Sequence, residues 1–138
     1  MDSIIIILFS AVLIIGLILM VVIATTRKSP KGVNVEHYRS KWLDITSSVS
    51  QDESSRHLAI LNADKLLDQA LKDSGFKGET MGERLKNAKA RLKHRDAIWL
   101  AHKLRNRIAH ESDVRVTNQD VKRSLAAFKS ALKDLGAL

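Results

Sequence analysis

An uncharged apolar run near the amino terminus constrains what this chain can fold into more than any other feature. The run extends from Ile4 to Ala24 and consists almost entirely of Ile, Leu, Val, Ala, Met and Phe. As an α-helix with a rise of about 1.5 Å per residue it measures roughly 30 Å, the thickness of the hydrocarbon core of a bilayer. We therefore expect residues 1–25 to be a single transmembrane anchor, with residues 4–24 in the lipid bilayer, rather than a helix buried in a soluble core.

A cleaved signal peptide is the main alternative for this run, and three features argue against it. The residue after Met1 is acidic, no clear small-x-small cleavage site follows, and the run exceeds the about 7 to 15 apolar residues of a signal peptide. Arg27, Lys28 and Lys31 follow the span, whereas only Asp2 precedes it. The positive-inside rule then predicts a single-pass protein of the cell membrane whose C-terminal domain is cytoplasmic.

The rest of the chain predicts a small all-α domain behind a short connection. Residues 26–33 contain the single Pro and three basic residues, and we expect them to form a basic juxtamembrane linker. Within residues 34–138 apolar positions recur every three or four residues, and no stretch alternates convincingly with a period of two. This pattern predicts an antiparallel four-helix bundle with one extra leading helix.

The leading helix is expected over residues 35–50. Its apolar residues Tyr38, Trp42, Ile45 and Val49 recur at spacings of four, three and four, which gives one amphipathic stripe. We favour packing of this stripe on the bundle. The alternative is that its aromatic rings rest at the membrane interface, where Trp and Tyr are enriched.

Capping signals predict where three of the bundle helices begin. Ser50 with Glu53 and Thr80 with Glu83 have the residues of capping boxes, and Thr117 is suited to cap the last helix. The expected inner faces are Leu58, Leu61, Leu66, Ala70 and Leu71 in the first bundle helix, Met81, Leu85, Ala88 and Leu92 in the second, and Val121, Leu125, Phe128, Leu132 and Leu135 in the last.

The third bundle helix, expected over residues 95–109, concentrates the polar chemistry of the chain. Trp99, His102, Asn106 and His110 follow one another at spacings of three, four and four, and Arg105 borders this stripe. We expect their side chains to share one accessible strip. The opposite arc is expected to face the core and consists of Ala97, Leu100, Ala101, Leu104 and Ile108.

Arg105, Asn106 and His110 lie in the run Arg-Asn-Arg-Ile-Ala-His, which resembles the signature of the HEPN superfamily of small helical-bundle domains. Counting helix order as well, the likeness covers about residues 50 to 138. It implies a homodimer with a shared active site and, in catalytic members, metal-independent RNA cleavage, whereas other members only bind nucleotides or partners. In this setting Trp99 and His102 are expected in the dimer contact.

The three signature residues supply what RNA cleavage needs, because RNA carries its own nucleophile in the 2′-hydroxyl. His110 is the candidate general base or acid, Arg105 the candidate for binding phosphate oxygens, and Asn106 would orient the phosphate or the His. On a continuing helix Arg105 and His110 are about 140° apart, so one site requires that the helix end at the His or that a second subunit contribute. The alternative is that Arg105 and His110 only pair with acids such as Glu111 or Asp64.

Basic residues are concentrated around this helix. Nine of them lie between Arg84 and Arg107, against the single acid Asp96, and this window holds the whole net charge of +8. It suggests a polyanion partner, either RNA or the anionic inner leaflet, although a merely solubilising surface is the alternative. The RNA-binding candidates are Arg91, Lys93, Arg95, Lys103 and Arg107.

These observations predict a membrane-anchored, HEPN-like domain that binds RNA and is a candidate metal-independent endoribonuclease of a toxin or defence type, with an antitoxin-like partner protein. No metal or other cofactor is expected, because His94, His102 and His110 are spaced by eight residues, which is not a helical ligand spacing. The alternatives are a non-catalytic dimerisation or interaction module tethered to the membrane, and a basic scaffold on anionic lipid.

Overall fold

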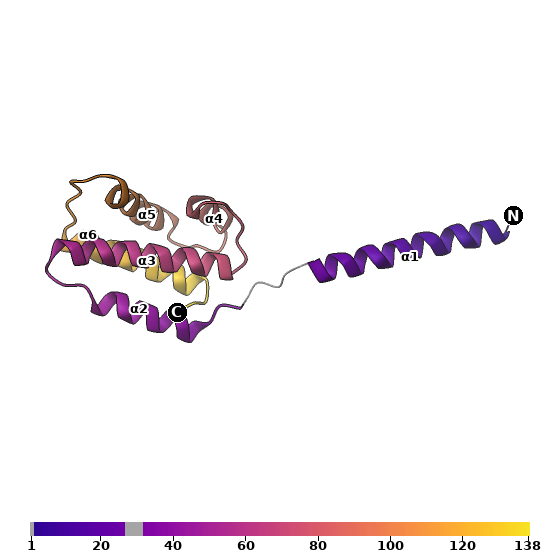
Figure 1. Ribbon diagram of the computed structural model, residues 1–138, viewed down its shortest axis with the longest axis horizontal. Coiled ribbons are helices and arrows are strands. Elements are labelled where there is room, and N and C mark those ends of the chain that lie inside the picture. The colour runs from indigo at the N-terminus through magenta and orange to yellow at the C-terminus, as the bar shows by residue number, and fades with distance from the viewer. Residues whose placement is uncertain (1, 27–31) are drawn as a thin grey trace.

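The protein is all-helical over the residues that the structure describes. The structure is a computed structural model that describes residues 2–26 and 32–138, and this part of the chain contains six helices and no strand (Figure 1). The helices are α1 (Asp2–Thr26), α2 (Val35–Ser47), α3 (Glu53–Asp73), α4 (Met81–Asn87), α5 (Arg95–His110) and α6 (Asn118–Asp134). The all-α prediction is therefore confirmed. The predicted linker residues Arg27, Lys28, Pro30 and Lys31 lie outside the described residues.

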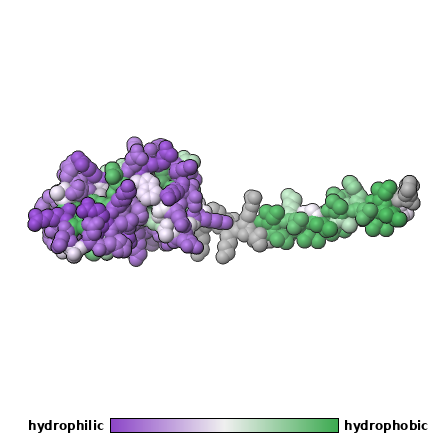
Figure 2. Space-filling view, turned by 90° about the horizontal axis from the view of Figure 1, so that it is seen from above, coloured by the Kyte–Doolittle hydropathy of each residue, from purple (hydrophilic) through white to green (hydrophobic). Residues whose placement is uncertain are grey.

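Helix α1 is long and apolar enough to cross a membrane. Residues Ser3–Ile23 form a continuous apolar stretch of 21 residues, and their side chains are exposed. Figure 2 shows α1 as an almost unbroken hydrophobic surface, whereas the visible surface of the bundle is mainly hydrophilic. The expected anchor segment thus forms the expected helix.

Helix α3 is the central element of the bundle, because it contacts α2, α4, α5 and α6 (Figure 1). Helices α5 and α6 also pack on each other. Apolar side chains from α2, α3, α5, α6 and the loop before α6 fill the space between these helices. The largest that are fully buried are Tyr38, Ile60, Leu67, Leu71, Ile98, Val116, Phe128 and Leu132.

Helix α2 packs on the bundle, as favoured from its sequence. Tyr38, Trp42 and Ile45 are buried and belong to the core. The Tyr38 hydroxyl donates a hydrogen bond of 2.6 Å to Asp73 at the end of α3. Burial, followed by the hydrogen bond to Asp73 and the charge of Asp73, raises the pKa of Tyr38 above its ordinary value. The leading helix is shorter than predicted and ends at Ser47.

The predicted caps Thr117 and Thr80 are confirmed, and the cap predicted at α3 is wrong. The Thr117 hydroxyl accepts a hydrogen bond from the backbone N–H of Asp120, whose carboxylate accepts one from the Thr117 N–H, so α6 has a complete capping box. Thr80 caps α4 through the backbone N–H of Glu83. At α4 the Glu83 carboxylate accepts from the backbone N–H of Glu79, so the predicted capping box is not complete. Helix α3 is instead capped by Asp52, and its carboxylate accepts from two backbone N–H groups. Ser50 lies too far before the helix to serve, although its hydroxyl bonds Ser55.

The buried faces of α3 and α4 differ in part from the prediction. Leu58 was expected inside, but it is 59% exposed, because α3 turns Ala59, Ile60 and Ala63 toward its neighbours. The small side chains of Ala59 and Ala63 let this central helix approach its neighbours closely. Helix α4 ends at Asn87, so Leu92 reaches the core from the loop that follows rather than from a helix.

Helix α5 is rotated relative to the predicted apolar arc. Leu100 is 67% exposed, whereas Ile98 is fully buried and His102 is only 8% exposed. The prediction that Leu100 faces the core and that His102 lies on an accessible strip is therefore wrong. The physical reason is an acid on α3 that supplies a partner for the His102 ring inside the bundle.

Candidate functional site

The predicted signature residues line one groove on the side of α5 that faces α3 and the amino end of α4. Arg105, Asn106 and His110 form one wall of this groove, which has a volume of about 800 Å³. Asp64 and Lys65 from α3 lie on the opposite wall. Residues 79–82, from the loop before α4 and the first turn of that helix, border the groove as well.

Asp64 is the buried residue around which the groove is built. It is 3% exposed, and its Oδ1 atom lies 2.8 Å from Nδ1 of His102. Its other oxygen, Oδ2, lies 3.2 Å from Nε of Arg105, in an ion pair whose alignment is poorer than that of a hydrogen bond. A carboxylate buried this deeply is retained when cationic and hydrogen-bonding partners compensate for the lost water.

The side chain of Asn106 closes this cluster into a ring of four residues. Nη1 of Arg105 donates to Oδ1 of Asn106 at 3.0 Å, and Nδ2 of Asn106 lies 3.3 Å from Nε2 of His102. Because the amide nitrogen can only donate, Nε2 of His102 must accept, and Nδ1 then carries the proton that is donated to Asp64. Every member thus has a donor or acceptor role that fits a neutral His102. We call Asp64, His102, Arg105 and Asn106 the polar ring.

The polar ring holds part of the Arg105 and Asn106 side chains and so limits which of their atoms can contact a ligand. The Arg105 side chain keeps 33% of its surface exposed while its inner edge is held by Asp64 and Asn106. The pairing of Arg105 with Asp64, considered from the sequence as an alternative to phosphate binding, is therefore present. The expected orientation of a His by Asn106 occurs at His102 and not at His110.

His110 differs from the ring residues because it is exposed. It is the last residue of α5, one residue beyond the predicted end at Ala109, and Glu111 after it adopts an extended backbone. Within the part of the chain that the structure describes, no hydrogen bond or ion pair engages its imidazole. His110 therefore shares the groove with Arg105, without direct contact, and remains available to a ligand.

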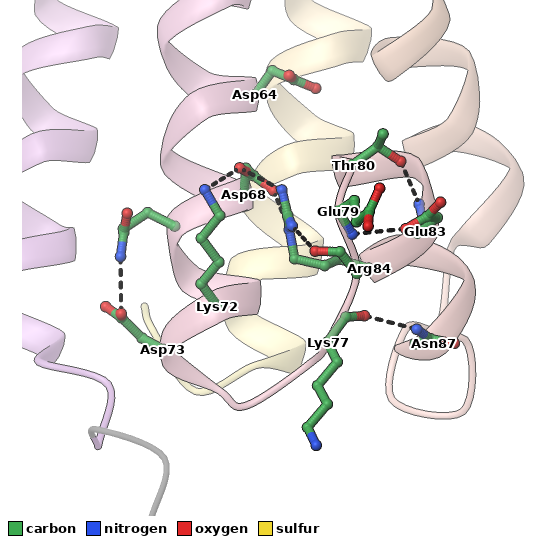
Figure 3. Close-up of polar contacts among 12 residues, drawn as sticks. Asp64, Asp68, Lys72, Asp73, Lys77, Glu79, Thr80, Glu83, Arg84 and Asn87 are labelled. Atoms are coloured by element: carbon green, nitrogen blue, oxygen red, sulfur yellow. Dashed lines mark hydrogen bonds and ion pairs between the residues drawn. The ribbon is translucent and has the colours of Figure 1, made fainter. Parts of the chain in front are cut away.

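A second pair of buried charges fastens the far wall of the groove. Arg84 is 6% exposed and donates to both carboxylate oxygens of Asp68, at 2.7 and 3.1 Å, and also to the carbonyl of Gly78. Figure 3 shows Arg84 and Lys72 converging on Asp68. Burial raises the pKa of Asp68, but the hydrogen bonds and charges of Arg84 and Lys72 outweigh it and lower the pKa overall. Arg84 belongs to the basic stretch between Arg84 and Arg107, but its side chain is held by Asp68 and Gly78 and therefore stabilises the fold.

The five predicted RNA-binding residues lie on α5 and in the loop before it. Lys103 lines the groove with the signature residues. Arg107 pairs with Glu111 at 3.3 Å, and Lys93 lies 4.0 Å from an oxygen of Asp134. Arg91 and Arg95 are exposed, and Arg95 lines a second groove of about 550 Å³ together with Lys86, Lys89 and Trp99.

Trp99 lies between the two grooves and lines both. Its ring is partly buried and meets the His102 ring edge-on at a centroid distance of 5.9 Å. It also covers Gly82, where an added Cβ would lie 3.5 Å from the ring. Trp99 is therefore held within its own chain, and His102 is too deeply buried to offer a partner much of its surface.

Sequence reasoning identified three of the polar-ring residues as site candidates but gave Asp64 only a secondary place. A detectable signal existed, because Asp64 shares its helix face with the apolar residues Ile60, Leu61 and Leu67. The sequence around Asp68 and Arg84 contained no comparable signal for their ion pair.

Among residues 2–26 and 32–138, no three His, Asp or Glu side chains gather as a metal site would require.

Comparison of the chain with protein-family models, with curated proteins and with solved structures finds no match.

Proposed function

We propose that this protein is anchored in the cell membrane by α1 and that its cytoplasmic bundle binds RNA and cleaves it without a metal ion. The observation that carries the proposal is the pairing, in one groove, of an exposed and unengaged His110 with a positioned Arg105. Lys103 adds a second cation at the same place. The proposed anchoring rests on the length and composition of α1 and on the basic residues that follow it in the sequence.

In the proposed reaction the 2′-hydroxyl oxygen attacks the adjacent phosphorus, and the bond to the 5′-oxygen breaks. His110 either takes the proton from the 2′-hydroxyl or gives one to the departing 5′-oxygen, and water takes or gives the other proton. The exposed part of Arg105 binds the phosphate oxygens and stabilises the charge that develops on them. Asn106 and Asp64 act on Arg105, because they hold its guanidinium in place.

The substrate that fits these features best is a single strand. We call the groove lined by Arg105, Asn106 and His110 the signature groove. Trp99 joins it to the groove lined by Lys86, Lys89 and Arg95. An RNA backbone that follows these cations passes the Trp99 ring, and a base can stack on an aromatic side chain only when it is unpaired.

The test uses the full-length protein in detergent micelles, incubated with single-stranded RNA and excess EDTA. We expect cleavage that leaves a cyclic phosphate, and no cleavage of RNA blocked at the 2′ position. His110→Ala should lower the rate by about 10² to 10⁴-fold while RNA binding is nearly unchanged. Arg105→Ala should reduce both binding and cleavage. The matched control is His37→Ala, since His37 is also an exposed helical histidine but lies on α2.

A second candidate function, a membrane-tethered interaction module, is favoured by the polar ring itself. The Asp64 carboxylate compensates the Arg105 charge, as a purely structural ion pair would. Under this function the protein neither cleaves RNA nor loses RNA affinity when Arg105 is changed. Unchanged activity in His110→Ala, or activity that disappears with chelation, would rule out the proposed cleavage.

A further inference from the structure

His102 is a buried titratable side chain that the proposed cleavage does not use. It is 8% exposed, and both of its ring nitrogens are engaged inside the polar ring. Nδ1 donates to Asp64, and Nε2 accepts from the side-chain amide of Asn106. Histidine is the side chain whose charge most readily changes between about pH 5 and 8. A second proton on His102 therefore has to be accommodated by these two partners.

Protonation of His102 is compatible with one of its contacts and not with the other. Asp64 accepts from Nδ1 in either state, and this hydrogen bond strengthens when the ring becomes positive. Nε2 changes from acceptor to donor, whereas the Nδ2 group of Asn106, 3.3 Å away, can only donate. The contact is restored when the amide of Asn106 turns over and presents its oxygen to the imidazolium.

A turn of the Asn106 amide changes how Arg105 is held. Oδ1 of Asn106 accepts from Nη1 of Arg105 at 3.0 Å, and within residues 2–26 and 32–138 this is the one hydrogen bond of the Arg105 side chain. Its ion pair with Asp64 is poorly aligned. After the turn, Arg105 faces the amide nitrogen of Asn106, which is another donor. Asp64 is then also shared between two cations.

We propose that His102 is a positioning residue that acts on Arg105 through Asn106. While His102 is neutral, the polar ring holds Arg105, and when His102 is protonated, Arg105 is released toward the signature groove. We call this coupling the amide switch. Its consequence for RNA rests on the proposed function, because the released guanidinium would bind a phosphate oxygen there. The switch itself involves only the four side chains of the polar ring.

The charges around His102 leave Asp64 and Arg105 as its nearest charged neighbours in the polar ring. Asp64 favours the imidazolium, and Arg105 opposes it. The other charged or titratable groups that line the same groove are Lys65 and Asp68 on α3, Glu79 and Arg84 on the α4 side, and Lys103 and His110 on α5.

Two of these groups, Asp68 and Arg84, already compensate each other. On α6, Asp120 and Arg123 line a separate groove, which His102 does not line. Release of Arg105 also relieves the repulsion between its charge and that of the imidazolium, so protonation and release favour each other.

Nuclear magnetic resonance of the full-length protein in detergent micelles, without RNA, tests the switch directly. Between pH 8 and pH 5, the His102 ring signals, the Asn106 side-chain amide and the Arg105 Nε–H should all shift with one midpoint. In His102→Gln, the Asn106 and Arg105 signals should stay constant over this range. The matched control is His37→Gln, which removes an exposed histidine on α2 and should leave the three shifts unchanged.

A His102 ring that does not titrate in this range, or that titrates without moving the Asn106 amide, would overturn the switch. The wild-type titration alone decides this point, even if His102→Gln fails to fold. No RNA is present, so the result does not depend on whether the protein cleaves RNA.

Binding of a single-stranded RNA with 2′-O-methyl groups measures the consequence at the groove, because this probe cannot be cleaved through its 2′ position. Fluorescence anisotropy should show that the affinity rises from pH 8 to pH 5.5 by about tenfold more in the wild type than in His102→Gln, the effect of one hydrogen bond to a charged group. His37→Gln should behave as the wild type. Equal pH dependence in the wild type and His102→Gln would show that the switch does not release Arg105 to phosphate. Absence of binding at both pH values would instead contradict the proposed RNA function, and the resonance titration would still decide the switch.

Discussion

At the scale of single residues, Asp64 links the stability of the bundle to the geometry of its groove. Its two oxygens contact His102 and Arg105, and those two side chains are joined again through Asn106. A ring of linked hydrogen bonds and ion pairs of this kind restricts the arrangement of its side chains. The Arg105 side chain is therefore held in one position in the groove before any ligand binds.

Replacing Asp64 by Ala should cost the bundle about 3 to 5 kcal/mol in the free energy of unfolding, because partners of a buried carboxylate lose their compensation. Chemical denaturation of the full-length protein in detergent, followed by far-UV circular dichroism, measures this loss. Asp44→Ala serves as the control, since Asp44 is an exposed acid on α2. If the two variants lose equally little stability, the ring does not hold the fold as described.

At the scale of the helices, α5 explains why some of the structure could not be predicted from the sequence. The element order, the Thr80 and Thr117 caps and most of the α6 seam follow from local spacing, and they are confirmed. The side of α5 that faces inward depends on Asp64, which is 38 residues away from His102 in the sequence. Periodicity alone predicts that an apolar arc is buried. It does not predict that an acid on another helix makes a histidine acceptable inside.

Helix α6 provides a test in which pH changes stability in a known direction. Hydrogen bonds from the Thr117 side chain and backbone lower the pKa of Asp120. A folded-state pKa below the unfolded one stabilises the protein above the unfolded pKa, and this contribution is lost as pH falls through the folded pKa. Asp120→Ala should therefore cost about 1 kcal/mol at pH 7, and the cost should shrink as pH falls below about 4.

Chemical denaturation of the wild type and Asp120→Ala at several pH values checks this prediction. Asp113→Ala is the control, because Asp113 is an exposed acid in the loop before the same helix. A cost for Asp120→Ala that stays constant down to pH 3 would mean that the ionised carboxylate is not what stabilises the cap.

At the scale of the whole molecule, the net charge of +8 should make the proposed RNA binding dependent on salt. Each phosphate contact to a single strand contributes about −0.7 to the slope of log affinity against log salt concentration. Lys103→Ala should reduce the magnitude of this slope by about 0.7, since Lys103 lines the proposed site. Lys129→Ala on α6 removes the same charge at an exposed position outside the signature groove. Equal slopes for both variants would place the RNA elsewhere.

The orientation of the whole chain follows from the basic residues after α1, which predict a cytoplasmic bundle. A tag at the carboxyl terminus should resist protease added to intact cells and become sensitive once the membrane is permeabilised. Digestion in intact cells would place the bundle outside the cytoplasm, and an intracellular RNA substrate would then be untenable.

The packing of α2 also determines how the bundle would respond to mechanical load. Any tension between α1 and the bundle enters at the start of α2, where Tyr38 is joined to Asp73 at the far end of α3. This tension acts first on Tyr38, Trp42 and Ile45, the apolar side chains that fasten α2 to α3. The polar ring joins α3 to α5 and includes no residue of α2. If the bundle is pulled through α1, we therefore expect α2 to separate from α3 before Arg105 is displaced.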